Sequence, residues 1–112
     1  MRNVRGPKRA LTPVVKRGPG LWIAAGSPVT PDEVNIEIGW ALARRRKELR
    51  LSLAQVARRC GVSLQQIHKY ETGQNVIAAP MLFQLACCLK VPVSYFFETL
   101  EARRRTTVLS EA

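Results

Sequence analysis

The stretch Leu51–Glu71, which reads LSLAQVARRCGVSLQQIHKYE, decides the fold of this 112-residue chain. Ser52 is a good N-cap for a short helix over residues 53–60, because its hydroxyl accepts a bond from an otherwise unpaired amide of the first turn. Gly61 follows where a tight turn needs positive φ, which glycine adopts without a steric penalty. Ser63 then caps a second short helix over residues 63–71. The stretch therefore predicts two helices joined by a short turn that contains glycine.

The helix over residues 63–71 has two chemically different sides. At about 100° per residue, Ile67, Tyr70 and Glu71 share an anchoring side, and polar side chains point away from it. Gln can pair with adenine N6 and N7, Lys can donate to guanine O6 and N7, and an apolar tip can rest against a thymine methyl. The predicted base-reading residues are Gln65 and Lys69, with Leu64, Gln66 and His68 as secondary contacts. His68 fits a plain solvent-facing position equally well. The two helices are therefore expected to form a helix-turn-helix whose second helix reads DNA.

Charge is unevenly placed along the chain, whose formal net charge is +10. Residues 1–31 hold six basic side chains and no acidic one. Residues 32–98 hold nine basic and six acidic side chains, and the last fourteen residues hold three basic and two acidic ones. This balance favours a polyanionic partner, most often nucleic acid, although charge alone also fits an acidic membrane surface. The longest apolar run is far shorter than the roughly 20 residues of a spanning helix. We therefore expect no membrane span and a location in the bacterial cytoplasm, at the nucleoid.

The chemistry-bearing residues give little support to catalysis. The three cysteines, Cys60, Cys87 and Cys88, lack metal-ligand spacing, and the single His68 cannot form a metal site alone. Small apolar cysteines in a reducing cytosol are favoured over a redox switch. There is also no phosphate-cradling glycine loop after a strand and no pair of acids at useful spacing. We therefore expect no enzyme activity, no cofactor and no metal.

Composition divides the chain into three parts. Residues 1–31 are rich in proline, glycine and basic residues without a sustained period, which predicts a flexible basic arm. The arm is either a strap along DNA or a solvated tail, and its apolar segment 21–25 either docks on a partner or stays disordered. Residues 32–99 form the folded domain. Residues 100–112 are expected to be a C-terminal tail, with Arg103, Arg104 and Arg105 on a frayed helix or solvated coil.

Three further helices are expected around the helix-turn-helix. One begins near Pro31, with Thr30 or Asp32 as its cap, and buries a stripe at helical spacing. That stripe consists of Ile38, Ala41, Leu42 and Leu49. Another begins at Pro80 and buries Leu82, Leu85, Ala86 and Leu89. The last follows Pro92, where the apolar side chains exceed what a small core needs. A dimer seam is therefore predicted at Val93, Tyr95 and Phe96.

About sixteen positions between Glu37 and Phe97 carry a family resemblance, among them Ile38-Gly39, Arg46, Gly61-Val62-Ser63 and Tyr70-Glu71. In order and spacing they resemble the Cro/C1-type (XRE) helix-turn-helix domain of bacteria and phages. Residues 65–71 and 91–97 are similar to a group of alphaproteobacterial regulators of that family. The resemblance implies an all-α fold, a compact five-helix bundle of the lambda-repressor-like type, with its third helix in the major groove of DNA.

The resemblance also implies roles for single residues. In this family an arginine of the first helix often pairs with the glutamate that closes the third, which corresponds to Arg46 and Glu71. Family members often have glutamine at the position of Leu53, so here only the backbone amide reaches phosphate. Arg50 stands where the family often has glycine. The predicted phosphate contacts are Leu53, Ser63, Arg45 and Asn75, of which Asn75 equally suits a plain turn.

These observations predict a sequence-specific, DNA-binding transcriptional regulator. It would act as a homodimer on an inverted repeat whose half-sites lie about 34 Å apart. The alternative is a helix-turn-helix adaptor that acts mainly through protein partners, as an antitoxin or an RNA polymerase-associated cofactor. The apolar segment 21–25 in a flexible arm is the feature behind that alternative, because such a segment can fold on binding.

Overall fold

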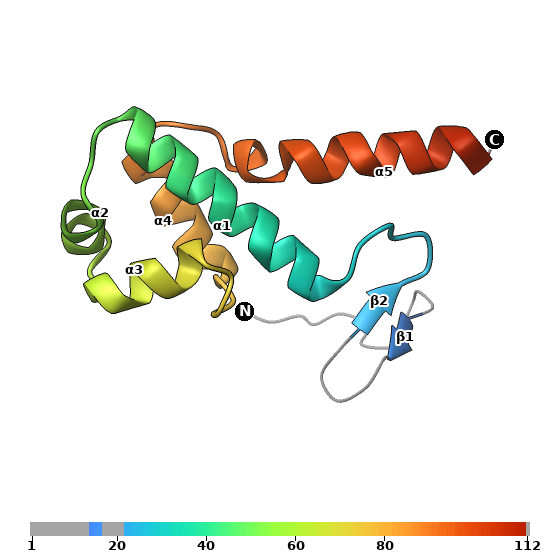
Figure 1. The fold of residues 1–112 in the computed structure, drawn as a ribbon, viewed down its shortest axis with the longest axis horizontal. Helices are drawn as coiled ribbons and strands as arrows, with labels where there is room; N and C mark the ends of the chain where they lie inside the picture. The colour runs from blue at the N-terminus through green and yellow to red at the C-terminus, as the bar shows by residue number, and fades with distance from the viewer. Residues whose placement is uncertain (1–13, 17–21, 112) are drawn as a thin grey trace, which may run out of the picture.

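The computed structural model describes residues 14–16 and 22–111, and most of them are helical (Figure 1). The elements in chain order are β1 (Val14–Lys16), β2 (Trp22–Ala24), α1 (Pro31–Glu48), α2 (Leu53–Cys60), α3 (Leu64–Glu71), α4 (Ala79–Leu89), the 3-10 helix η1 (Val93–Phe97) and α5 (Glu98–Glu111). The predicted all-α bundle of five helices is confirmed. The two short strands are an addition that the sequence did not predict.

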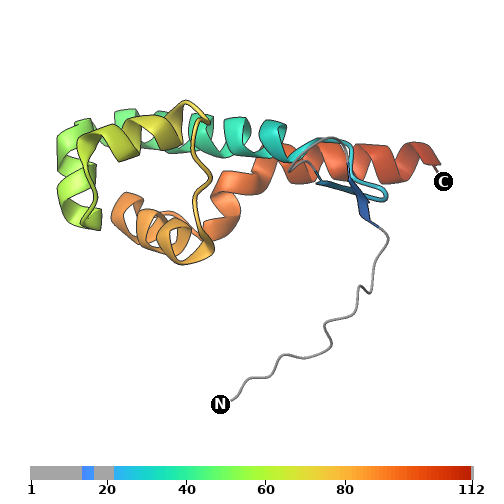
Figure 2. The same cartoon turned by 90° about the horizontal axis from the view of Figure 1, so that it is seen from below.

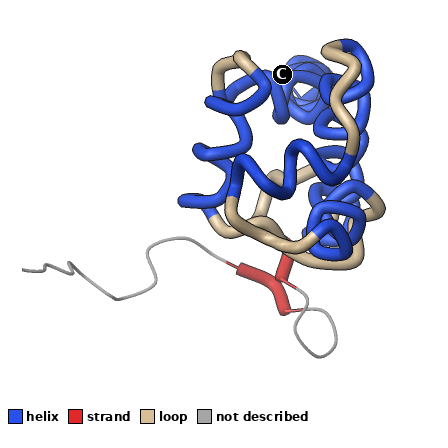
Figure 3. The backbone as a smooth tube through the Cα atoms, turned by 90° about the vertical axis from the view of Figure 1, so that its left-hand side faces the viewer, coloured by secondary structure: helices blue, strands red, loops and turns tan. Residues whose placement is uncertain are grey.

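Each strand is only three residues long. β1 and β2 pair antiparallel, with Val14 opposite Ala24 and Lys16 opposite Trp22, and they lie to one side of the helical bundle (Figure 3). β-branched and aromatic residues favour such pairing. Two short paired strands therefore lie within the segment predicted as a flexible arm. Residues 1–13 and 17–21 of the arm lie outside the described residues.

Capping residues define where α1 and α2 begin. Thr30, rather than Asp32, caps α1: the Glu33 amide donates to Thr30 Oγ1 at 3.2 Å, and Glu33 Oε1 accepts from the Thr30 amide at 2.8 Å. Ser52 and Gln55 form the same reciprocal box at the start of α2, at 3.0 and 2.7 Å. Gly61 ends α2 with φ +71°, as the sequence predicted. Hydrogen bonds within a few residues thus mark where α1 and α2 begin, and Gly61 marks where α2 ends.

Two other turns use a left-handed residue that is not glycine. Arg50, just after α1, has φ +57°, and Lys90, just after α4, has φ +60°. Arg50 stands where the family that the sequence resembles often has glycine, and it adopts the left-handed geometry that glycine favours. A side chain with a Cβ costs roughly 1–2 kcal/mol in this conformation. Both turns are therefore less stable than glycine would make them.

The core lies between α1 and α3 on one side and α4 on the other (Figure 2). Its fully buried side chains are Leu42, Val56, Ile67, Leu85, Leu89 and Phe96. The prediction that Phe96 belongs to a dimer seam was wrong, because its ring is only 2% exposed and fills this core. Val93 and Tyr95 are half-buried, and both pack against the same core. The apolar residues after Pro92 therefore serve mainly to close the bundle.

The C-terminal segment is helical, which is one of the two forms that the sequence left open. α5 is continuous from Glu98 to Glu111, so the boundary predicted after residue 99 falls inside it. Leu100 is buried, and Arg103 Nη2 lies 3.5 Å from Glu37 Oε2 on α1. Arg104 Nη2 lies 2.8 Å from Glu101 Oε1. The first turns of α5 therefore pack on the domain, and its end extends past the bundle (Figures 1 and 2).

The three cysteines are all free thiols. Cys60 and Cys88 are half-buried and pack against the core, whereas Cys87 is exposed. Burial, with Cys88 close by, raises the pKa of the Cys60 thiol to about 11. Because the thiolate is the reactive form of cysteine, Cys60 is a small core residue rather than a reactive one at neutral pH.

Within the residues that the structure describes, no single helix is long and apolar enough to cross a membrane. Only Ala79–Leu89 taken together with Val93–Thr106, a pair bent by 109°, reaches that length and composition.

Candidate DNA-binding interface

The inner side of α3 is fixed by burial and by one very close backbone contact. Ile67 is fully buried and Tyr70 nearly so. A Cβ placed on Gly39 of α1 would lie 2.5 Å from the Tyr70 carbonyl oxygen and 2.6 Å from that of Glu71. Only glycine therefore lets α1 approach the C-terminal end of α3 this closely. The sequence resemblance included Gly39, but the reason for glycine became visible only in the structure.

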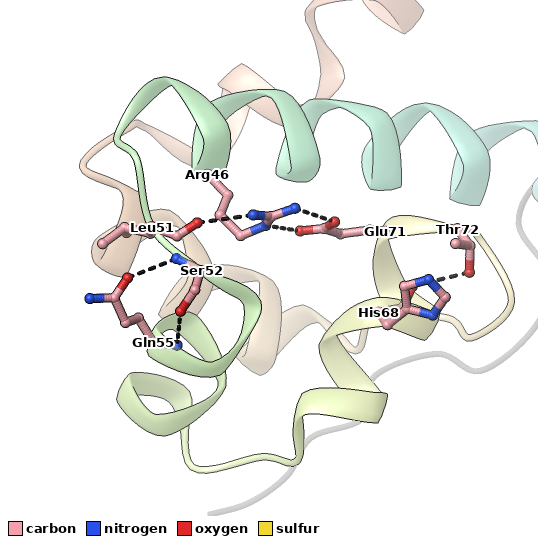
Figure 4. Close-up of polar contacts among 7 residues, drawn as sticks. All are labelled: Arg46, Leu51, Ser52, Gln55, His68, Glu71 and Thr72. Atoms are coloured by element: carbon pink, nitrogen blue, oxygen red, sulfur yellow. Dashed lines mark hydrogen bonds and ion pairs between the residues drawn. The ribbon is translucent and has the colours of Figure 1, made fainter.

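Arg46 and Glu71 join α1 to the end of α3. Arg46 Nε donates to Glu71 Oε2 at 2.6 Å and Nη2 donates to Oε1 at 3.0 Å (Figure 4). The third guanidinium nitrogen, Nη1, donates to the Leu51 carbonyl at 2.9 Å. The two side chains are only 12% and 8% exposed. One guanidinium thus holds three segments together: α1, the entry to α2 and the last turn of α3.

The outer side of α3 carries polar and cationic side chains. Gln65, His68 and Lys69 are exposed, and Leu64 at the start of the helix is 42% exposed. Residues at these positions share one face of a helix. The structure therefore brings four of the five predicted base-reading residues to one surface, opposite the anchors Ile67 and Tyr70.

Gln66, the fifth, is half-buried and has a partner. Asn75 Nδ2 donates to Gln66 Oε1 at 3.3 Å. The backbone of the same loop is also tied to α3, because the amides of Gln74 and Asn75 donate to the Lys69 carbonyl at 2.9 and 3.3 Å. Asn75 thus contacts α3, a role that sequence reasoning missed.

The four predicted phosphate contacts do not form one group. Ser63 accepts from the Gln66 amide at 3.0 Å, which leaves its hydroxyl hydrogen free to donate. The side chain of Leu53 packs against the core, while its amide lies in the open first turn of α2. Arg45 is elsewhere: Nε donates to the Leu89 carbonyl at 2.9 Å and Nη1 to Glu48 at 3.3 Å. The structure therefore engages Arg45 at the end of α4 and does not bring it together with the others.

Two cations beside α3 were not predicted. Arg58 and Arg59 are exposed in the last turn of α2, directly before the turn that leads into α3. Clustered cations next to a reading helix favour contact with phosphates. The signal that could have identified them is their position in the last turn of α2, a few residues before α3 begins at Leu64.

Tyr95, predicted as a seam residue, is engaged within the protein. Its hydroxyl accepts from Arg44 Nε at 3.3 Å, and the Arg44 guanidinium carbon lies 5.6 Å from the ring centre. The ring also packs edge-on against Phe96, with centroids 5.7 Å apart. Tyr95 therefore links α1 to η1.

Two short helices across a glycine turn, the second with a buried side and an exposed polar side, define a helix-turn-helix DNA-binding domain. A helix-turn-helix family model (HTH_3) matches residues 42–96. An uncharacterized transcriptional regulator in the ATPase CF(0) region of Rhodospirillum rubrum is 46% identical over 72 residues, which are 64% of this chain and 67% of that protein. The chain belongs to this HTH_3 (XRE-type) family of helix-turn-helix transcriptional regulators.

Other relatives agree with this assignment. An uncharacterized HTH-type transcriptional regulator of Sinorhizobium medicae is 38% identical over 68 residues, 61% of this chain and 49% of that protein. The crystal structure of an HTH_3 family transcriptional regulator from Vibrio cholerae matches with a TM-score of 0.57 and 28% identity, over 61% of this chain and 38% of that one. The resemblance to alphaproteobacterial regulators is thus confirmed, although the chain spans only about half of the Sinorhizobium relative.

Proposed function

We propose that the protein binds a specific DNA sequence as a homodimer and so regulates transcription. The observation that carries the proposal is the outer side of α3, where Gln65, His68 and Lys69 are exposed. On its inner side, the Arg46–Glu71 pair and the close contact at Gly39 fix α3 against α1. A rigid helix with a polar outer side is what direct reading in the major groove requires.

In this proposal the reading helix and its neighbours have separate tasks. Gln65 and Lys69 select bases, and Leu64, Gln66 and His68 make secondary contacts. The Leu53 amide and the Ser63 hydroxyl position the phosphate backbone, and Arg58 and Arg59 add attraction that does not depend on sequence. Asn75 acts through Gln66 rather than on phosphate.

The test is selection of bound sequences from a random duplex library at physiological salt. We expect enrichment of an inverted repeat with half-sites about ten base pairs apart, as two copies of α3 in successive major grooves require. Binding without enrichment, which only fades steeply as salt rises, would contradict the proposal and leave a non-specific polyanion binder.

The adaptor alternative depended on the apolar segment 21–25. Residues 22–24 of this segment are strand β2, paired with β1. No contact among the described residues favours the adaptor over DNA binding. Deletion of residues 1–29 separates the two, because loss of partner capture with DNA affinity retained would favour the adaptor.

A further inference from the structure

The outer face of α1 carries two large apolar side chains that are exposed, Trp40 and Ile36. Trp40 is 64% exposed in the middle of the 18-residue helix, and Ile36, one turn earlier, is 42% exposed. A large exposed aromatic residue flanked by polar residues is typical of an interaction surface. We define the outer face of α1 as Glu33, Ile36, Glu37, Trp40, Ala43, Arg44 and Lys47.

Charges on this face are separated along the helix. The residues before Trp40 include the acids Glu33 and Glu37, and those after it include the bases Arg44 and Lys47. Glu33 and Lys47 lie seven residues before and after Trp40, so all three share one line along the helix. The same seven-residue spacing joins Glu37 to Arg44 and Ile36 to Ala43, on the two sides of that line. When a second copy of this face lies antiparallel to the first, its basic residues therefore meet the acidic residues of the first, and its acidic residues meet the basic ones.

We propose that the outer face of α1 binds a second copy of this chain, with the two α1 helices antiparallel and the two Trp40 side chains meeting at the two-fold axis. Glu33 of each copy then faces Lys47 of the other, and Glu37 faces Arg44. Ile36 enters the hollow of about 390 Å³ that Trp40, Ala43, Arg44 and Lys47 line on the other copy. An isologous contact of this kind uses one patch twice. The proposal rests on the proposed function, a homodimer on DNA, and assigns the dimer contact to α1 because Phe96 is buried in the core.

The contacts already present leave these side chains able to pair. Glu33 uses Oε1 in the cap of α1, and a carboxylate has a second oxygen. Arg44 gives only Nε to Tyr95, and a guanidinium has further donors. Lys47 is exposed and makes no ion pair with the described residues. Glu37 Oε2 is 3.5 Å from Arg103 Nη2 of α5, and its second carboxylate oxygen can meet Arg44 of the other copy. Pairing across the two-fold axis thus breaks none of these bonds.

This dimer also places the two α3 helices on one side. α3 contacts α1 at Gly39, which is about 100° around the helix from Trp40. Two antiparallel helices in contact are related by an axis perpendicular to the plane that contains them both. Rotation about this axis leaves each part of the protein on the same side of that plane. Because α3 lies about 100° around α1 from Trp40, the α3 helices of both copies are on one side of the plane. Both α3 helices then face one side, as an inverted repeat requires.

A contact made by one helix is small. At 1.5 Å per residue, α1 is about 27 Å long, so the buried area lies at the low end for specific interfaces, below about 1,200 Å² in total. We therefore expect a weak dimer in free solution. A truncation of Trp40 at its centre removes a hot spot worth about 2 kcal/mol, so Trp40→Ala should raise the dimer dissociation constant about thirtyfold.

The decisive experiment is sedimentation of the full chain and of two charge-reversed variants. Lys47→Glu and Glu33→Lys should each be monomeric at concentrations where the parent is dimeric. An equal mixture of the two should recover a heterodimer. The Lys47→Glu variant has glutamate at positions 33 and 47, the Glu33→Lys variant has lysine at both, and these opposite charges face each other across the axis. Arg58→Glu, a charge reversal on α2 away from this face, is the matched control and should dimerise like the parent.

Three results would overturn the proposal: a parent that stays monomeric at its highest soluble concentration, a Lys47→Glu variant that dimerises like the parent, or a mixture that does not recover. Circular dichroism of each variant confirms that it is folded, and Lys47→Glu tests the face without touching the cap at Glu33. Sequence selection by the parent is measured separately. A dimer that follows these rules but selects no sequence would retain this surface and contradict only the proposed function.

Discussion

Arg46 on α1 and Glu71 at the end of α3 are joined by two hydrogen bonds of 2.6 and 3.0 Å in a nearly buried site. Loss of one partner leaves the other charge without compensation, and the cost of such a loss is about 3–5 kcal/mol. We expect Glu71→Ala to lower the free energy of unfolding by that amount, measured by urea denaturation. The exposed pair Glu101–Arg104 is the control, and Glu101→Ala should cost at most about 0.5 kcal/mol. Equal small losses in both variants would show that the buried pair does not hold α3.

Gly39 is the second point where α1 touches α3. Alanine is normally the better helix residue by about 1 kcal/mol, but here its Cβ would lie 2.5 Å from the Tyr70 carbonyl oxygen. Backbone cannot move aside as a side chain can, so we expect Gly39→Ala to destabilise the fold by about 2–3 kcal/mol. Thermal unfolding measures the change. A variant at least as stable as the parent would mean that the two helices are further apart than the structure has them.

Lys90 ends α4 in the left-handed conformation, with φ +60°. Glycine takes this conformation without the Cβ penalty, so we expect Lys90→Gly to raise the free energy of unfolding by about 1 kcal/mol. Lys90→Ala removes the same charge but keeps the Cβ, and it should give no such gain. If both variants change stability equally, the effect belongs to the charge and not to the backbone.

Local signals made much of the fold predictable. Ser52, Gly61 and Ser63 determine the ends of α2 and α3 by hydrogen bonds and dihedral angles within a few residues, and the structure has the same ends. Lys90 is the contrasting case, since a lysine gives no local sign of a left-handed turn. The strands β1 and β2 were missed for a related reason. Each is three residues long, too short for an alternating pattern to develop.

The site was predictable only in part, because side-chain partners depend on tertiary packing. The periodicity of α3 identified which residues face outward, since that follows from 100° per residue. It did not reveal that Arg45 turns to the Leu89 carbonyl or that Phe96 enters the core. Arg45 and Arg46 are adjacent in sequence, yet the rotation of one residue sends their side chains to α4 and α3. An apolar run after Pro92 likewise fits a surface or a core equally well.

Gln65 is the residue on which base selection should depend most. It is exposed on the outer side of α3 and lies away from the core. We expect Gln65→Ala to weaken binding to the selected operator by about 1–3 kcal/mol and to change binding to random DNA little. Gln84→Ala, at an exposed glutamine of α4, is the control and should leave both affinities unchanged. Equal losses on operator and random duplexes would show that Gln65 only grips the backbone.

Gln66 and Asn75 should act on DNA as a unit. Asn75 Nδ2 donates to Gln66 Oε1 at 3.3 Å, which leaves the Gln66 amino group to donate to an acceptor on DNA. We therefore expect non-additive losses of operator affinity in a double-mutant cycle of Gln66→Ala and Asn75→Ala, with a coupling energy of about 1 kcal/mol. Gln74→Ala, at the exposed neighbour of Asn75, should show no coupling with Gln66→Ala.

The variant Asn75→Asp gives a sharper version of the same test. A carboxylate at position 75 only accepts hydrogen bonds, so the Gln66 amide should turn its amino group toward it and present its carbonyl oxygen to DNA. The preferred base near Gln66 should then change from one with an acceptor edge, such as guanine, to one with an amino donor, such as adenine or cytosine. The added negative charge lowers affinity for every sequence alike, so the preference profile from a second library selection is the measurement that decides. Additive losses in the cycle together with an unchanged profile would mean that Asn75 only closes the loop after α3.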